Sequence, residues 1–150
     1  MTNWILFFHV LSVIVWMGGS IYVEALMSAA SRGGDEGAYV TVFQRVGTTN
    51  RRLFNLAGVS TIVFGFWLVG ISSHIGFEEI WIGVGILLST IAVVIDLFYA
   101  TPRTDRVERM IDDPDQSDEA INAVIKQVVN AGHARVGLLF VAFIFMIFKF

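Results

Sequence analysis

The sequence contains no cysteine, which excludes disulfide bonds, thiolate metal sites and thiol redox chemistry. Charged residues are scarce as well, at 15% of the 150 residues, against 55% hydrophobic residues. The few Lys and Arg residues flank apolar segments, so we expect no nucleic-acid-binding surface. The N-terminus lacks the basic region and the cleavage site of a signal peptide, so we expect its apolar run to remain in the mature chain.

What the chain has in abundance is long apolar sequence, including 13 Phe. Four stretches have the roughly 20 residues that a helix needs to cross a hydrocarbon core: about 4–27, 53–73, 80–100 and 133–150. The sequence therefore predicts an all-α fold, an integral membrane four-helix bundle forming a single transmembrane domain over residues 1–150. The polar stretches 28–52 and 101–132 are the predicted cytoplasmic loops.

Helical signals continue into both polar stretches, so we expect helices that extend into the cytoplasm. The first stretch opens with a Gly-Gly break at 33–34 and then reads as a helix leading into the second span. The second begins with Pro102, which predicts the end of a helix, and has an acidic turn around Pro114. Asp115 or Ser117 then caps a helix that runs into the fourth span.

Basic residues are distributed unevenly between the two sides of this four-span arrangement. Lys149 lies alone on one side. The positive-inside rule therefore places both termini outside, in a prokaryotic-type plasma membrane. The expected partners are the lipid bilayer and either a second copy or a larger membrane complex. The basic residues on the cytoplasmic side are Arg32, Arg45, Arg51, Arg52, Arg103, Arg106, Arg109, Lys126 and Arg135.

One polar stripe runs along the first span. His9, Ser12, Trp16, Ser20 and Glu24 fall within about 60° of the His9 direction when successive residues turn by about 100°. An ionisable side chain inside a membrane span is by default the mark of a functional site. The stripe therefore predicts that this helix faces a polar or cofactor-filled bundle interior.

The topology limits where the histidines meet. His9 lies about 7 Å below the outer edge of the membrane, and His74 lies at the outer end of the second span. His133 lies near the inner end of the fourth span, about 18 Å deeper than His9. If His9 binds a metal, His74 is therefore the first candidate for a second ligand, and His133 is the next.

Two metal cofactors suit such a histidine. Haem b needs a neutral axial imidazole, apolar walls and room for a flat macrocycle, which the small and aromatic residues of the spans favour. Copper prefers clustered His and Met ligands, and Met17 and Met27 share the helix of His9 without a His-x-x-x-Met spacing. The structural alternative is that the glycines serve helix packing and that His9 is only a hydrogen-bonded residue.

A second polar group is expected toward the cytoplasmic side, where buried carboxylates need partners. The predicted pairs are Asp96 with Arg135 or Arg103, and Glu24 with Arg51 or Arg52. Such pairs could simply fix the four spans together, form a proton path, or place arginines against haem propionates. The group consists of Glu24, Asp96, Tyr99, Arg103, His133 and Arg135, with Arg51 and Arg52 nearby.

The segment HVLSVIVWMGGSIY, with His9, Trp16, Gly19 and Tyr22, resembles the first span of the HemJ-type protoporphyrinogen oxidases and of related CopD-like and uncharacterised four-span proteins. RRLFNLAGVSTIVFGFWLV resembles their second span, and Trp81 opens the third span as theirs does. The resemblance implies a bundle that holds haem b, with His9 as an axial ligand. The expected cofactor-binding residues are His9, Trp16, Gly19, Arg51 and Arg135.

Two departures distinguish the chain from the oxidases. Gly85 stands where they carry a lysine just after the third-span tryptophan, and Glu24 and Ala25 replace their Pro-Arg pair. Protoporphyrinogen oxidation is therefore not expected. The sequence predicts a haem b-binding membrane protein with a redox or electron-transfer role. The alternatives are a cofactor-free accessory subunit or small transporter that uses His9, Glu24 and Asp96, and a copper-handling membrane protein.

Overall fold

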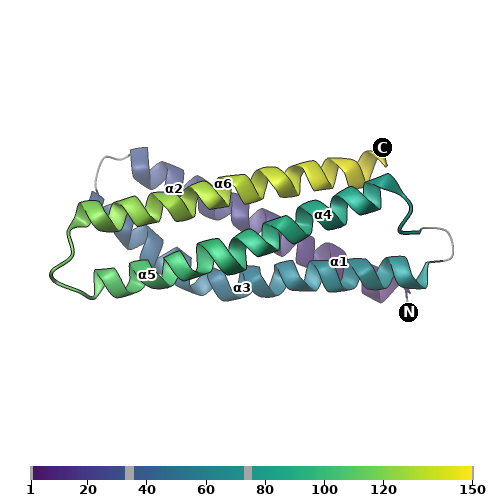
Figure 1. Ribbon diagram of the computed structural model, residues 1–150, viewed down its shortest axis with the longest axis horizontal. Coiled ribbons are helices and arrows are strands. Elements are labelled where there is room, and N and C mark those ends of the chain that lie inside the picture. The colour runs from purple at the N-terminus through teal and green to yellow at the C-terminus, as the bar shows by residue number, and fades with distance from the viewer. Residues whose placement is uncertain (1, 33–35, 73–75, 150) are drawn as a thin grey trace.

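Four long helical rods, packed side by side, build the protein (Figure 1). The computed structural model describes residues 2–32, 36–72 and 76–149, and every regular element in these ranges is helical. The predicted all-α four-helix bundle is therefore confirmed. The helical segments long and apolar enough to cross a membrane are Thr2–Arg32, Arg52–Ile71, Ile80–Ile111 and Asp118–Phe148.

The first and third rods each contain a π-helical turn. In the first rod, η1 (Ile14–Gly18) lies between α1 (Thr2–Val13) and α2 (Gly19–Arg32). The residues that flank η1 keep right-handed helical torsion angles, so the rod is continuous. The third rod has the same construction, from α4 (Ile80–Val94) through η2 (Ile95–Ala100) to α5 (Thr101–Ile111). π-helical turns are rare and often occur at functional sites.

The predicted helix end at Pro102 is wrong. Pro102 lies in the first turn of α5, and the third rod continues through it to Ile111. Proline interrupts a helix because it lacks an N–H and its ring crowds the carbonyl group four residues earlier. Here η2 ends at Ala100, two residues before the proline, so the Phe98 carbonyl group that the ring would crowd lies in a wider π-helical turn.

The polar stretches predicted as loops are largely helical. α3 (Glu36–Ile71) begins well before the second span, and α6 (Asp118–Phe148) begins well before the fourth. Ser117 caps α6 as predicted, because its hydroxyl accepts a hydrogen bond from the Ala120 N–H at 3.3 Å. The predicted Gly-Gly break at 33–34 lies outside the described residues.

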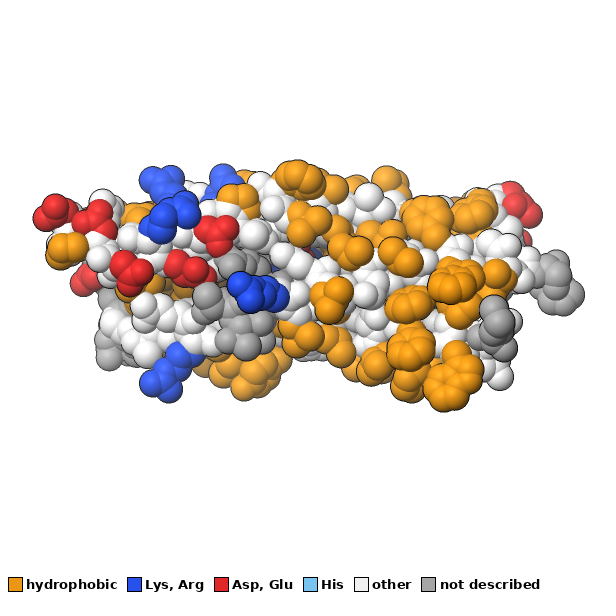
Figure 2. Space-filling view, turned by 90° about the horizontal axis from the view of Figure 1, so that it is seen from below, with side chains coloured by type: hydrophobic (Ala, Val, Ile, Leu, Met, Phe, Trp, Pro, Cys, Tyr) orange, Lys and Arg blue, Asp and Glu red, His pale blue; other side chains and the backbone are white. Residues whose placement is uncertain are grey.

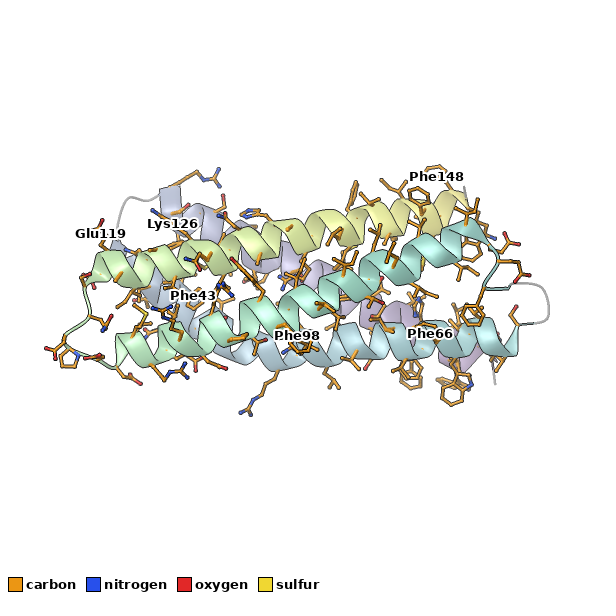
Figure 3. The ribbon with its side chains drawn as sticks, in the orientation of Figure 1. Phe43, Phe66, Phe98, Glu119, Lys126 and Phe148 are labelled. Carbon is orange, nitrogen blue, oxygen red and sulfur yellow. The ribbon has the colours of Figure 1, made fainter. Side chains whose placement is uncertain are left out.

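Charge and apolar surface separate along the bundle. On the face in Figure 2, most charged side chains gather over the end that holds the α5–α6 turn, which we call the charged end. Both chain ends lie at the opposite end of the bundle, which we call the terminal end (Figure 1). Phe66 and Phe98 are exposed and point away from the bundle, whereas Phe43 is buried between helices (Figure 3). This band of exposed apolar side chains suits contact with lipid.

Two groups of buried hydrophobic residues hold the rods together. Trp16, Phe54, Ala57, Ala92 and Leu139 form a cluster contributed by all four rods. A second cluster packs the helical extensions at the charged end, so these extensions continue the bundle. Its members are Met27, Tyr39, Phe43, Val107, Ile121, Val124 and Ile125.

Candidate functional site

A mostly apolar cavity of about 70 Å³ lies inside the bundle toward the terminal end. We call it the histidine cavity, because His9 is the ionisable residue in its lining. All four rods contribute to its wall, and small residues account for much of it. The lining residues are His9, Val13, Trp16, Met17, Thr61, Ile62, Gly65, Gly85, Ile86, Ser89, Leu139, Ala142, Phe143 and Met146.

The imidazole of His9 is held in one orientation. Its Nδ1 lies 3.0 Å from the carbonyl oxygen of Thr61. A carbonyl only accepts hydrogen bonds, so Nδ1 carries a hydrogen, and in the neutral ring Nε2 then keeps its lone pair. Gly65 allows the ring to lie against α3, since a Cβ there would be 3.2 Å from His9 Cε1. Metal-binding histidines are commonly oriented by this kind of bond.

A second cavity of about 70 Å³ lies toward the charged end, and we call it the charged cavity. Carboxylate, guanidinium, amide and hydroxyl groups share its wall with apolar side chains. The lining residues are Val23, Glu24, Met27, Phe43, Val46, Phe54, Asn55, Asp96, Ala100, Thr101, Thr104, Val128, Val129, Gly132 and Arg135.

Asp96 is the most tightly held polar group at the charged cavity. It is 4% exposed, and its Oδ1 accepts a hydrogen bond from Arg135 Nη1 at 2.6 Å. Its Oδ2 accepts one from Trp16 Nε1 at 3.2 Å. The predicted Asp96–Arg135 pair is confirmed. The two π-helical turns meet here, because η1 contains Trp16 and η2 contains Asp96.

Glu24 shares Arg135 with Asp96. Its Oε1 lies 4.0 Å from Arg135 Nη2, and its Oε2 lies 3.4 Å from His133 Nε2. The Glu24 side chain is 11% exposed, whereas the His133 side chain is 58% exposed. Within the described residues, Glu24 therefore contacts His133 and Arg135 and not Arg52, which is exposed.

The charged cavity contains polar atoms without hydrogen-bond partners among the described residues. These include Glu24 Oε2, which has ion-pair proximity to His133 without hydrogen-bond geometry, and Arg135 Nε. Gly132 leaves the space that the Glu24 carboxylate occupies, because a Cβ on Gly132 would overlap Glu24 Oε1. Burial, with a smaller contribution from the Glu24 charge, raises the pKa of the Tyr39 hydroxyl on the neighbouring part of α3.

Of the residues predicted to bind a cofactor, His9 and Trp16 line the histidine cavity and Arg135 lines the charged cavity. Trp16 lines the histidine cavity, and through its bond to Asp96 it also reaches the charged cavity. Gly19 packs against the ring of Phe54, whose face lies 5.8 Å from the Arg135 guanidinium. His133 lies at Glu24 and does not line the histidine cavity. His74 and the Arg51 side chain lie outside the described residues.

A haem group fits the histidine cavity in its donor chemistry but not in its volume. The Nε2 lone pair of His9 is what an axial ligand needs. An apolar cavity of about 150 Å³ is already needed to hold benzene, so about 70 Å³ does not accommodate a porphyrin in this packing. No cluster of three or more His, Asp or Glu side chains suited to a metal occurs among the described residues.

The sequence reasoning missed three contributors to these cavities. Thr61 orients His9 through a backbone atom, which no side-chain pattern reveals. Met146 lines the histidine cavity from α6, and Gly132 makes room for Glu24. Gly132 directly precedes His133 and lies three residues before Arg135. A small residue so close to two predicted site residues was the available signal that another side chain packs there. Met146 lies in an apolar run without any such signal.

Comparison with known proteins assigns the chain to a family. The profile of a family described as "Predicted integral membrane protein (DUF2269)" matches residues 3–150. No curated protein and no solved structure matches the chain. The family match shows that the chain belongs to a family of membrane proteins, but it does not connect the chain to the HemJ-type or CopD-like proteins. The resemblance to those proteins therefore stays a prediction. Since the profile covers nearly the whole chain, the protein belongs to the DUF2269 family of predicted integral membrane proteins.

Proposed function

We propose that this protein is a small proton-linked membrane carrier in which Glu24 binds the proton. The supporting observation is the position of Glu24, a largely buried carboxylate on a membrane-spanning rod whose Oε2 has no hydrogen-bond partner among the described residues. Intramembrane carboxylates of this kind mark proton relays and substrate pathways. Among the functions that the sequence analysis left open, only the small transporter gives the carboxylates of the charged cavity a role in the function itself.

His133 provides the proton route between solvent and Glu24. Its ring is more than half exposed, and its Nε2 lies 3.4 Å from Glu24 Oε2. An imidazole both accepts and releases protons near neutral pH, so it suits transfer at this position. The charged end holds most of the basic residues, which the positive-inside rule assigns to the cytoplasm. Proton exchange with Glu24 therefore takes place from the cytoplasmic side.

Arg135 couples the charge of Glu24 to the rest of the bundle. It lies 2.6 Å from Asp96 and 4.0 Å from Glu24, so it balances two carboxylates at once. When Glu24 is protonated, the attraction between Arg135 and Glu24 falls, and the guanidinium pairs with Asp96 alone. Because Asp96 also accepts the Trp16 hydrogen bond, this shift acts on both π-helical turns.

The first test is a pH-jump measurement on proteoliposomes bound to a solid-supported membrane. We expect a transient charge displacement that Glu24→Gln abolishes and that His133→Gln slows. Glu79→Gln is the matched control, because Glu79 is exposed at the opposite end of the bundle and should leave the displacement unchanged. Infrared difference spectra of the same samples should lose a carboxylic acid band only in Glu24→Gln. Equal signals from Glu24→Gln and the unaltered protein would exclude Glu24 as the proton-binding group.

A haem b protein with a redox role is the second candidate. The observation in its favour is the imidazole of His9, which a bond to the Thr61 carbonyl orients and which lines an apolar cavity. Haem in this cavity requires the rods to separate from their present packing. Protein purified from cells supplied with haem precursor should then show a Soret band that His9→Leu removes. A colourless preparation would exclude this candidate.

A further inference from the structure

Arg103 connects the third and fourth rods at the surface of the bundle. Its Nε donates a hydrogen bond to Gln127 Oε1 at 3.0 Å, and its Nη1 donates one to the Tyr99 carbonyl oxygen at 3.1 Å. The guanidinium also stacks on the Tyr99 ring, with Cζ 3.4 Å from the ring centroid. Long side chains at a surface are ordinarily free to change rotamer. These three contacts therefore fix a positive charge that would otherwise move.

This fixed charge lies at the level where the hydrocarbon core of a bilayer ends. Ile80 and Phe148 lie at the terminal end of the bundle (Figure 1). Tyr99 follows Ile80 by 19 residues, which is about 28 Å of helix, and Gln127 precedes Phe148 by 21 residues, or about 31 Å. A hydrocarbon core is about 30 Å thick. The Arg103 guanidinium is therefore at the headgroup level of the leaflet that the positive-inside rule assigns to the cytoplasm.

The neighbours of Arg103 are apolar toward the membrane and basic away from it. Phe98 is 75% exposed and points away from the bundle (Figure 3), and Tyr99 is 40% exposed. In the other direction along α5, Arg106 is exposed. Residues three apart on a helix are neighbours, with about 5–6 Å between their Cβ atoms. Apolar side chains for acyl chains thus lie next to two guanidinium groups for a headgroup.

The free donors of Arg103 select an oxygen anion. A guanidinium has five N–H groups, and the bonds to Gln127 and Tyr99 use two of them. The planar N–H groups of arginine match phosphate oxygens in both charge and geometry. Phosphate is also the anion that lies next to the acyl chains in a bilayer. A zwitterionic lipid has its own cation to balance its phosphate, so two arginines favour a lipid with net negative charge.

We propose that Arg103 and Arg106 form a binding site for one anionic phospholipid, such as phosphatidylglycerol, in the cytoplasmic leaflet. The lipid phosphate accepts hydrogen bonds from both guanidinium groups, and an acyl chain lies against Phe98. Gln127 is a positioning residue, because it holds Nε of Arg103 from the neighbouring rod. The site shares no residue with either cavity, so it is independent of the proton-carrier proposal and of the haem candidate.

The test is native mass spectrometry of the purified protein in detergent micelles, titrated with dioleoylphosphatidylglycerol or with dioleoylphosphatidylcholine. We expect one phosphatidylglycerol per chain, bound at least about 10-fold more tightly than phosphatidylcholine. Arg103→Gln should weaken phosphatidylglycerol binding by about 5–10-fold, since one basic residue near an anionic lipid surface contributes about fivefold and this one is held in place. Arg103→Lys keeps the charge but cannot both stack on Tyr99 and bond to Gln127, so it should also bind more weakly than the unaltered protein.

Arg109→Gln is the matched control. It removes the same charge from an exposed position of α5 that lies six residues, or about 9 Å, farther from the membrane than Arg103. Its affinity for phosphatidylglycerol should change by less than about twofold, because solvent and salt screen a charge at that distance. Circular dichroism should show the same helix content in all three variants, since these side chains lie at the surface.

Equal phosphatidylglycerol affinities of Arg103→Gln and Arg109→Gln would overturn the proposal, because diffuse positive charge would then explain binding. Unchanged affinity in Arg103→Lys would overturn it as well, by showing that the fixed guanidinium has no part in recognition. Displacement of the lipid by inorganic phosphate at equal concentration would assign the site to a free anion instead. Glu24→Gln should retain lipid binding, which separates failure of this proposal from failure of the proton-carrier proposal.

Discussion

The histidine cavity and the charged cavity have nearly the same volume, about 70 Å³ each, and opposite chemistry. The first is apolar around one neutral imidazole, whereas the second contains two carboxylates and one guanidinium. In a low-dielectric interior, charges that balance one another are strongly interdependent, while a neutral hydrogen-bonded group is nearly independent of its neighbours. The comparison indicates that one cavity is fixed by its charge balance and that the other is free to accept a ligand.

Trp16 is the boundary between the two cavities. Its indole ring lines the histidine cavity and packs against Gly58, while its Nε1 donates to Asp96 in the charged cavity. With 1% of its surface exposed, it is the most buried large side chain of the first rod. A change at Trp16 should therefore affect both cavities, whereas changes at His9 or Arg135 should affect one.

Arg135→Met should produce the largest effect. It leaves Asp96 and Glu24 buried without their counter-charge, which should lower the free energy of unfolding by about 3–5 kcal/mol. Unfolding in detergent micelles by added SDS, followed by circular dichroism, measures the loss. The double variant Asp96→Asn/Arg135→Met should recover much of it. A loss below about 1 kcal/mol in the single variant would contradict the view that charge balance fixes this cavity.

Trp16→Phe should have the next largest effect. The substitution keeps an aromatic ring but removes the hydrogen bond to the Asp96 carboxylate, with an expected loss of about 1.5–3 kcal/mol in the same unfolding assay. Trp67→Phe is the control, because Trp67 is 47% exposed on the lipid-facing side and should change stability little. If the two variants behave alike, Trp16 does not connect the cavities energetically.

Gly132→Ala tests the space around Glu24. The added methyl group would overlap Glu24 Oε1, so Glu24 must move, at an expected cost of about 1–3 kcal/mol. Gly137→Ala on the same helix has nothing within 4 Å of the new methyl group. It should be neutral or stabilising by up to about 1 kcal/mol, because Ala favours helices over Gly. The difference between these two variants in SDS unfolding gives the cost of displacing Glu24.

His9→Leu should have the smallest effect on stability. It removes one neutral hydrogen bond and places an apolar side chain in an apolar cavity, so a change below about 1 kcal/mol is expected. The same variant should nevertheless remove the Soret band that the haem candidate predicts. A stability loss as large as that of Arg135→Met would show instead that His9 is a structural residue. In that case the histidine cavity would need no ligand to explain the position of His9.

Much of the fold followed from the sequence, because span length and helical periodicity are local properties. The four apolar stretches, the cap at Ser117 and the inward direction of the His9–Glu24 stripe needed no knowledge of neighbours. The prediction that a helix ends at Pro102 was wrong because the π-helical turn before it, η2, cannot be recognised from residue types alone. The predicted helical extensions are present too, and packing between them stabilises helices that would be marginal on their own.

The candidate sites were predicted less completely, because their partners are distant in the sequence. Charge complementarity narrowed the partner of Asp96 to Arg135 or Arg103, and packing chose Arg135, while Arg103 stacks on Tyr99 and bonds to Gln127. The predicted pairing of Glu24 with Arg52 was wrong, because Glu24 lies at His133 and Arg135 of another rod, and the Arg51 side chain lies outside the described residues.

The sequence by itself determined that this protein crosses a membrane with four helices and that the first turns its polar face inward. These properties depend on the lengths of apolar runs and on the periodicity of a helix, both of which are local. The tertiary structure alone decided that Trp16 meets Asp96, that Arg135 serves two carboxylates and that Met146 faces the cavity of His9. Those encounters depend on the register in which separate rods pack, and register is set by contacts among all four rods together.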